Sequence, residues 1–162
     1  MRFCIILLVL FGLFQKSVAQ TGMRQAIFME MKGAGVNLTL NYDTRFSKKV
    51  NGIGGRIGFG YFGDRFQNAI NIPLEINYLA GKRNHFLEIG TGMVWGSYKE
   101  NSDDQKGFAD IYITPLQGWA FCLQAGYRYQ QPGHILFRAN FTPLFTRNKI
   151  YPLAGISRGY AF

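Results

Sequence analysis

The chain has 162 residues, of which 48% are apolar, 16% aromatic and only 17% charged. This length suits one domain. The many aromatic and few charged residues exclude a disordered protein. The 20 glycines have no period and there are only two cysteines, which excludes collagen-like and disulfide-stapled chains. The net charge of +9 raises nucleic acid as a partner, but no basic patch is interleaved with stacking aromatics, so nucleic-acid binding is not expected.

Residues 1–19 are predicted to be a secretory signal peptide. Arg2 precedes an apolar run from Phe3 to Phe14, and the segment ends in Ser17-Val18-Ala19, with small residues at the positions that precede cleavage. A membrane-spanning helix is the alternative, but this run reaches only about 18 Å, short of a hydrocarbon core of about 30 Å. We therefore expect a mature domain over 20–162, in which Cys122 is the only cysteine and a small buried apolar residue.

The rest of the chain alternates apolar and polar residues, which predicts β-strands. Val36–Asp43, for example, has one wholly apolar and one wholly polar face. No later apolar run is long enough for a membrane-spanning helix. The eight predicted strands are Gln25–Lys32, Val36–Asp43, Arg56–Tyr61, Ile70–Tyr78, Leu87–Trp95, Trp119–Tyr129, Ile135–Leu144 and Ala154–Phe162.

The residues on the second face of these strands favour a membrane barrel over a soluble sandwich. They are small or polar, mostly Gly, Asn, Thr, Arg and Glu, and suit a narrow polar interior. A transmembrane barrel has this arrangement, with apolar side chains toward lipid. Alternation alone does not say which face is inside, so a secreted soluble sandwich or lipocalin-like carrier stays open. In that alternative the inward-pointing residues are Leu38, Leu40, Ile72, Leu74, Ile76, Phe121 and Leu123.

The connections between the strands differ in length. Those at 46–53, 81–84 and 131–133 are short, whereas the one at 97–118 is long. With a periplasmic N-terminus, eight strands put the three short turns on the periplasmic side and the long loop outside, as in outer-membrane barrels. The first outer turn is then Lys32–Gly35. The alternative is a bulge in one long strand, in which case Ala109–Thr114 supplies the eighth strand.

Five segments carry a resemblance to small outer-membrane β-barrel proteins of Gram-negative bacteria, the OmpA/OmpX-like class. The resemblance implies an all-β, eight-stranded antiparallel up-and-down transmembrane barrel in the cell outer membrane. The segments are Leu40–Tyr42, Ile72–Leu79, His85–Gly90, Gly126–Gln130 and Gly155–Phe162.

The last of these segments is similar to the insertion signal of such proteins, which implies the barrel-insertion machinery as a partner. Ile156, Tyr160 and Phe162 fit the signal, whereas Arg158 departs from it on the lipid-facing register. An arginine there costs about 2 to 4 kcal/mol at the midplane but about 0 to 1 near the interface. Pro73 is a second irregularity, which strands tolerate at a bulge or an unpaired position.

The polar face is predicted to fill the barrel with a charge network. Its four acids and three bases carry a net charge of −1. Buried charges are costly unless paired, and the interior of an eight-stranded barrel is just wide enough for its side chains. We expect a plugged lumen and no general porin function, although a proton or ion path through these charges is an alternative. The network residues are Glu30, Asp43, Arg56, Glu75, Glu88, Arg128 and Arg138.

The two rims of the predicted barrel carry aromatic and basic residues. Outer-membrane lipids are the expected partner of both, since anionic head groups attract each basic residue by about 1 kcal/mol; ordinary solvated turns are the alternative for the basic residues. The predicted interface aromatics are Tyr42, Tyr61, Tyr78, Trp95, Trp119 and Tyr129. The basic residues expected at the periplasmic rim, with no acid among them, are Arg24, Arg45, Lys48, Lys49, Lys82 and Arg83.

No enzyme chemistry is evident in the sequence. The only histidines, His85 and His134, each follow a short turn, and neither has an adjacent serine to activate. No catalytic residue, metal site or cofactor is therefore expected, and the predicted role of the monomer is structural or interactive, through the loop at 97–118. A lipid-modifying barrel enzyme is the alternative and requires a histidine beside a serine and a carboxylate.

Overall fold

A computed structural model of the chain describes residues 24–63, 67–100, 115–131 and 133–162. The predicted signal peptide over 1–19 and the segment Ala109–Thr114 lie outside these residues. Within the described residues, no helix has the length and apolar character needed to cross a membrane.

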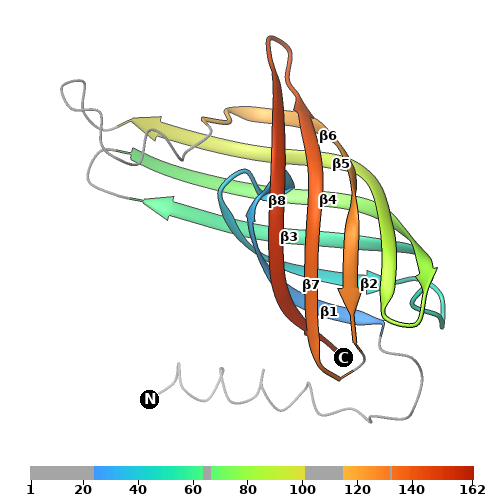
Figure 1. The fold of residues 1–162 in the computed structure, drawn as a ribbon. Coiled ribbons are helices and arrows are strands. Elements are labelled where there is room, and N and C mark those ends of the chain that lie inside the picture. The colour runs from blue at the N-terminus through green and yellow to red at the C-terminus, as the bar shows by residue number, and fades with distance from the viewer. Residues whose placement is uncertain (1–23, 64–66, 101–114, 132) are drawn as a thin grey trace, which may run out of the picture.

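Eight antiparallel strands form one closed barrel (Figure 1). Each strand pairs with the next in the chain, and β1 pairs with β8 to close the ring. This confirms the predicted eight-stranded up-and-down fold. The strands are β1 Gln25–Lys32, β2 Leu38–Arg45, β3 Gly52–Gly63, β4 Gln67–Lys82, β5 His85–Glu100, β6 Gly118–Gln130, β7 Ile135–Phe145 and β8 Ile150–Ala161.

The outward face of the barrel is apolar, as the membrane-barrel prediction requires. In β4, Leu74 and Ile76 are 56% and 59% exposed, whereas Glu75 between them is 2% exposed. The soluble sandwich or carrier is therefore excluded, since it needs the large aliphatic residues inside. The other exposed members of that set are Leu38, Leu40, Phe121 and Leu123, and Ile72 is half-buried.

The β4–β5 hairpin is longer than predicted. Each strand has sixteen residues, and only Arg83 and Asn84 separate them. The pairing continues to Gln67 opposite Glu100, so the positions from 97 to 100 extend β5 and do not begin the long loop. The predicted strands were too short because they were bounded by the apolar–polar alternation. The backbone pairing that starts at the tight turn continues beyond the residues that alternate.

The turn between β1 and β2 folds into the barrel. The short 3-10 helix η1, Gly33–Gly35, is buried, and the chain enters and leaves it at positive φ angles at Lys32 and Val36. A turn is thus present here, not a bulge. Val36 was predicted to share the outward face of the next strand, but it is fully buried inside the barrel, since the inward turn reverses its direction.

Pro73 occupies an unpaired position in the β3–β4 ladder. Its side chain faces inward, and the β3–β4 pairing runs through Ile57 with Leu74 and resumes at Gly60 with Asn71. The register is the same on both sides of this gap, so no bulge is present. The ladder simply lacks the hydrogen bond that proline has no N–H to donate.

Candidate functional site

The barrel interior contains one connected group of charged side chains, which we call the charge network. The seven predicted members all lie inside the barrel, each no more than 2% exposed. Arg45 joins them at 4% exposed and was wrongly expected at the periplasmic rim. It follows Asp43 by two residues in β2 and therefore points to the same side of the sheet. With Arg45, four carboxylates face four guanidinium groups, so the interior is neutral, not −1.

Arg56 is the centre of one half of the charge network. Its guanidinium forms an ion pair with Glu30, and Nη1 donates to Glu75 Oε2 at 3.2 Å. Nε donates to Asn41 Oδ1 at 3.0 Å, and Nη1 also reaches Gln124 Oε1 at 3.3 Å. These residues come from β1, β2, β3, β4 and β6, so this one side chain ties five strands together across the interior.

Glu88 is the centre of the other half. Its carboxylate accepts two hydrogen bonds from Arg138, each of 2.9 Å, and lies 3.8 Å from Arg128 Nε. Arg128 also donates to Asp43 at 3.3 Å, and Asp43 accepts from Arg45 at 2.7 Å. An ion pair of 3.6 Å between Arg138 and Glu30 joins the two halves. Bidentate, multiply bonded charges of this kind recover much of the desolvation cost of burial.

Phe28 lies among the guanidinium groups. Its ring centroid is 4.5 Å from Arg138 Cζ, 5.2 Å from Arg56 Cζ and 5.9 Å from Arg128 Cζ. These separations suit cation–π attraction, which is strongest where charges are desolvated. Phe28 was not among the residues predicted for the interior, although its place two residues before Glu30 puts both side chains on the inward face.

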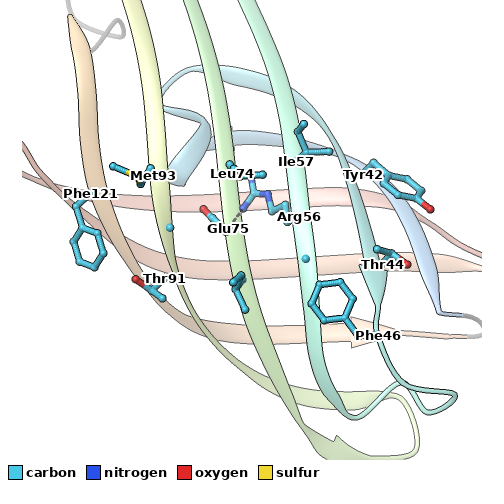
Figure 2. Close-up of a pocket in the computed structure, with 13 residues that line it drawn as sticks. Tyr42, Thr44, Phe46, Arg56, Ile57, Leu74, Glu75, Thr91, Met93 and Phe121 are labelled. Carbon is cyan, nitrogen blue, oxygen red and sulfur yellow. Dashed lines mark hydrogen bonds and ion pairs between the residues drawn. The ribbon is translucent and has the colours of Figure 1, made fainter.

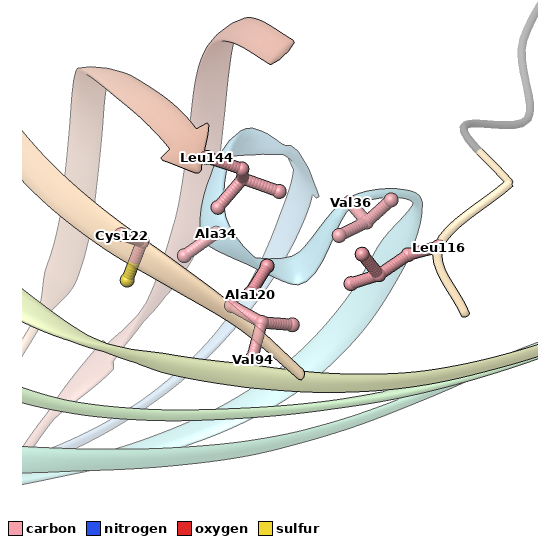
Figure 3. Packing of buried hydrophobic residues seen from close by; sticks show 7 residues of the cluster. All are labelled: Ala34, Val36, Val94, Leu116, Ala120, Cys122 and Leu144. Atoms are coloured by element: carbon pink, nitrogen blue, oxygen red, sulfur yellow. The ribbon is translucent and has the colours of Figure 1, made fainter. Parts of the chain in front are cut away.

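The interior also has an apolar layer, which corrects the prediction of a small or polar second face. Its residues come from the inward turn, from the segment before β6 and from β5, β6 and β7 (Figure 3). The two layers are connected, because the Gly35 N–H donates to Glu30 Oε2 at 3.2 Å. The members of the apolar layer are Ala34, Val36, Val94, Leu116, Ala120, Cys122 and Leu144.

The predicted interface aromatics lie at different levels of the wall. Trp95 and Trp119 are cross-strand partners near the end of the β5–β6 hairpin that faces away from the chain's C-terminus. Tyr61 is close to the end of β3 on the same side, and is 61% exposed. Tyr78 and Tyr129 lie toward the opposite end, whereas Tyr42 faces outward within β2.

The outward residues of the predicted insertion signal lie on β8, the strand that closes the barrel, or directly after it. Ile156, Tyr160 and Phe162 are 53%, 52% and 39% exposed, and the rings of Tyr160 and Phe162 stack at 6.4 Å. Arg158 is also exposed on this face, opposite Met29 of β1 and Phe137 of β7. Arg158 therefore faces outward, as the alternation of the last strand predicted.

The two histidines have different contacts: the ring of His85 lies against tyrosine side chains, and His134 forms backbone hydrogen bonds. His85 Nδ1 lies 2.5 Å from the Tyr127 hydroxyl oxygen, and its ring packs edge-on against Tyr129 at 5.3 Å. His134 contributes its backbone groups to hydrogen bonds with Gln131 and Ala161. In the part of the chain that the structure describes, no group of three or more His, Cys, Asp or Glu side chains is arranged to hold a metal ion.

Comparison with known proteins gives a likeness of fold. No protein-family model and no curated protein matches the sequence. The N-terminal β-barrel domain of Pseudomonas aeruginosa OprF superposes with a TM-score of 0.61 at 14% identity, covering 88% of this chain and 98% of that one. Yersinia pestis outer membrane protein Ail, solved in a phospholipid bilayer nanodisc, gives 0.52 at 13% identity, covering 87% and 99%. The fold is therefore that of small outer-membrane β-barrels.

Proposed function

We propose that the chain is a monomeric integral protein of the cell outer membrane, with a structural or surface-interaction role and a plugged lumen. The single observation that carries the proposal is the combination of an apolar outward face with an interior filled by the charge network and the apolar layer. A general porin needs a water-filled channel. Here, paired charges and packed apolar side chains occupy that space.

The dimensions of the wall support a place in the membrane. The thirteen residues of β6 extend over about 43 Å at about 3.3 Å each, or about 30 Å along the axis at a tilt of about 45°. That exceeds an apolar band of about 25 Å, which leaves room for aromatic residues at both edges. We propose that the end with the C-terminus faces the periplasm and that β8, together with the residue after it, binds the barrel-insertion machinery through Ile156, Tyr160 and Phe162.

We further propose that the barrel is not an enzyme. A histidine acts as a general base when it is within reach of the nucleophile's proton and is oriented by a third group. The partners recorded for His85 are Tyr127 and Tyr129, with no serine or carboxylate among them. This geometry supports the structural role over the lipid-modifying alternative.

We expect the folded protein to leave vesicles closed to solutes. Purified protein is reconstituted into phosphatidylcholine vesicles, and ion conductance and sugar-driven swelling are compared with those of protein-free vesicles. Because the network fills the lumen, both rates are expected to equal the protein-free values. A matched variant with Glu30, Arg56, Glu88 and Arg138 all replaced by alanine removes both signs of charge together and is expected to leak ions. Sugar uptake through the unaltered barrel would overturn the plugged lumen.

A further inference from the structure

A row of outward positions crosses four strands of the wall. Thr44, Gly55, Ile76 and Thr91 are successive cross-strand partners on β2, β3, β4 and β5. Three of the four are small, although the rest of the outward face consists largely of bulky apolar side chains. The wall is therefore thinner at Thr44, Gly55 and Thr91 than beside them, whereas Ile76, 59% exposed, projects from the same row.

Larger side chains border the row and turn it into a groove. The next outward row begins with Tyr42, Ile57 and Leu74 and continues through Met93 and Phe121, again as successive cross-strand partners. The ring of Phe46, which follows β2, packs against Gly55 in the row, and Figure 2 shows these side chains around the hollow. The groove has a volume of about 700 Å³, and its exposed lining is almost entirely apolar.

The turn that follows one end of the groove is positively charged. Thr44 is one residue from the end of β2, and the following turn carries Lys48 and Lys49, both exposed. Among the side chains that the structure describes, every carboxylate lies inside the barrel. The two lysines therefore lie in the turn four and five residues after Thr44, exposed to the surroundings, and the described side-chain carboxylates all point away from them into the barrel.

We propose that this groove is a phospholipid site, which holds one acyl chain of an anionic phospholipid while Lys48 and Lys49 bind its phosphate. The proposal rests on the membrane location proposed above. Strands about 4.8 Å apart place Thr44 about 14 Å from Thr91, or about 10 Å deeper along the axis at a strand tilt of about 45°. One leaflet accounts for about half of a 30 Å hydrocarbon core. The groove therefore stays within the leaflet that an acyl chain occupies below its head group.

The β4–β5 turn provides a matched control for the charge. Lys82 and Arg83 are two basic residues at the same end of the barrel as Lys48 and Lys49. On these strands, however, the small-residue row lies six positions from the turn, at Thr91 relative to His85. The β4–β5 turn therefore carries the same charge as the β2–β3 turn, but no end of the groove lies next to it in the chain.

The test measures the first lipid bound to the folded protein. Detergent-solubilised barrel is titrated with phosphatidylglycerol or phosphatidylcholine, and the Kd of the first bound lipid is read by native mass spectrometry. We expect the unaltered protein to prefer phosphatidylglycerol. The double variant K48Q/K49Q is expected to lose about fivefold in this preference for each lysine, which is about 1 kcal/mol per basic residue. K82Q/R83Q is expected to change it less than twofold. Equal losses in the two variants would overturn the site, because they indicate a diffuse basic rim.

A second variant tests the groove separately from the charge. T44L/T91L fills the groove with larger apolar side chains that suit a lipid-facing wall, and is expected to weaken the binding of both lipids while keeping their ratio. A matched control is Ala154→Leu, at an outward position on β8, which is expected to have no effect. Unchanged lipid binding in T44L/T91L would overturn the proposal. It would also be overturned if the unaltered protein were a dimer that T44L/T91L dissociates, because a second copy of the chain would then occupy the groove.

The state of the barrel is checked on unboiled and boiled gel samples. A heat-dependent shift in migration with unaffected lipid binding in all variants overturns the groove alone. A chain that shows no such shift and does not enter vesicles overturns both the groove and the proposed membrane location.

Discussion

Replacing Arg56 by methionine is expected to lower the free energy of unfolding by about 3 to 5 kcal/mol, the usual cost of breaking a buried ion pair from one side. Arg56 is 1% exposed and serves both Glu30 and Glu75, so its loss leaves two carboxylates without their shared partner in a closed interior. The measurement is a urea titration of the protein in phosphatidylcholine vesicles, followed by tryptophan fluorescence.

Arg158→Met is the matched control for this prediction. The same chemical change is made on an outward arginine that forms no ion pair with the residues that the structure describes, so the free energy of unfolding is expected to change by about 1 kcal/mol or less. The triple variant E30Q/R56M/E75Q is expected to recover part of the stability, because it removes the uncompensated charges as well. A loss below about 1 kcal/mol for Arg56→Met alone would mean that the charge network does not hold the barrel together.

Leu74→Arg is expected to cost about 2 to 4 kcal/mol of stability in vesicles, the range for a basic side chain on the lipid face at the bilayer midplane. Leu74 is 56% exposed and is the eighth of the sixteen residues of β4, so its side chain lies far from both rims. The same urea titration measures this effect.

Ile135→Arg is the corresponding control at the rim. Ile135 is 52% exposed and is the first residue of β7, where an arginine reaches the interface and costs about 0 to 1 kcal/mol. Equal losses of stability at the two positions would contradict a bilayer around this wall, because the cost of an arginine depends on its depth in a bilayer but not on its position in water.

The orientation of the wall was predictable from the sequence because strand geometry has a period of two. Once Glu75 is assigned to the interior, Leu74 and Ile76 must face outward, and the structure agrees. The same parity places Phe28 with Glu30 and Arg45 with Asp43. Neither Phe28 nor Arg45 was predicted to lie inside, because aromatic residues were expected on the lipid face and residues near a turn in the solvent.

The partners within the interior were not predictable from a single sequence. Arg128 meets Asp43 across 85 positions of chain, and that contact depends on the registers of several strands and on barrel closure. The inward turn at Gly33–Gly35 is a similar case, because positive φ angles at its ends send Val36 inside against the strand pattern. The lipid groove also requires the register, since its residues are far apart in sequence and adjacent only across the strands.

The most direct test of the account is the contact of the outward face with lipid. Nitroxide labels are placed in turn at Leu74 and Ile76, in a background in which Cys4 is serine and Cys122 is alanine, and the protein is reconstituted into phosphatidylcholine vesicles. If this face contacts lipid, oxygen, which concentrates in the hydrocarbon, relaxes both labels strongly and a water-soluble nickel complex does not. Strong relaxation by the nickel complex at both positions would contradict this contact.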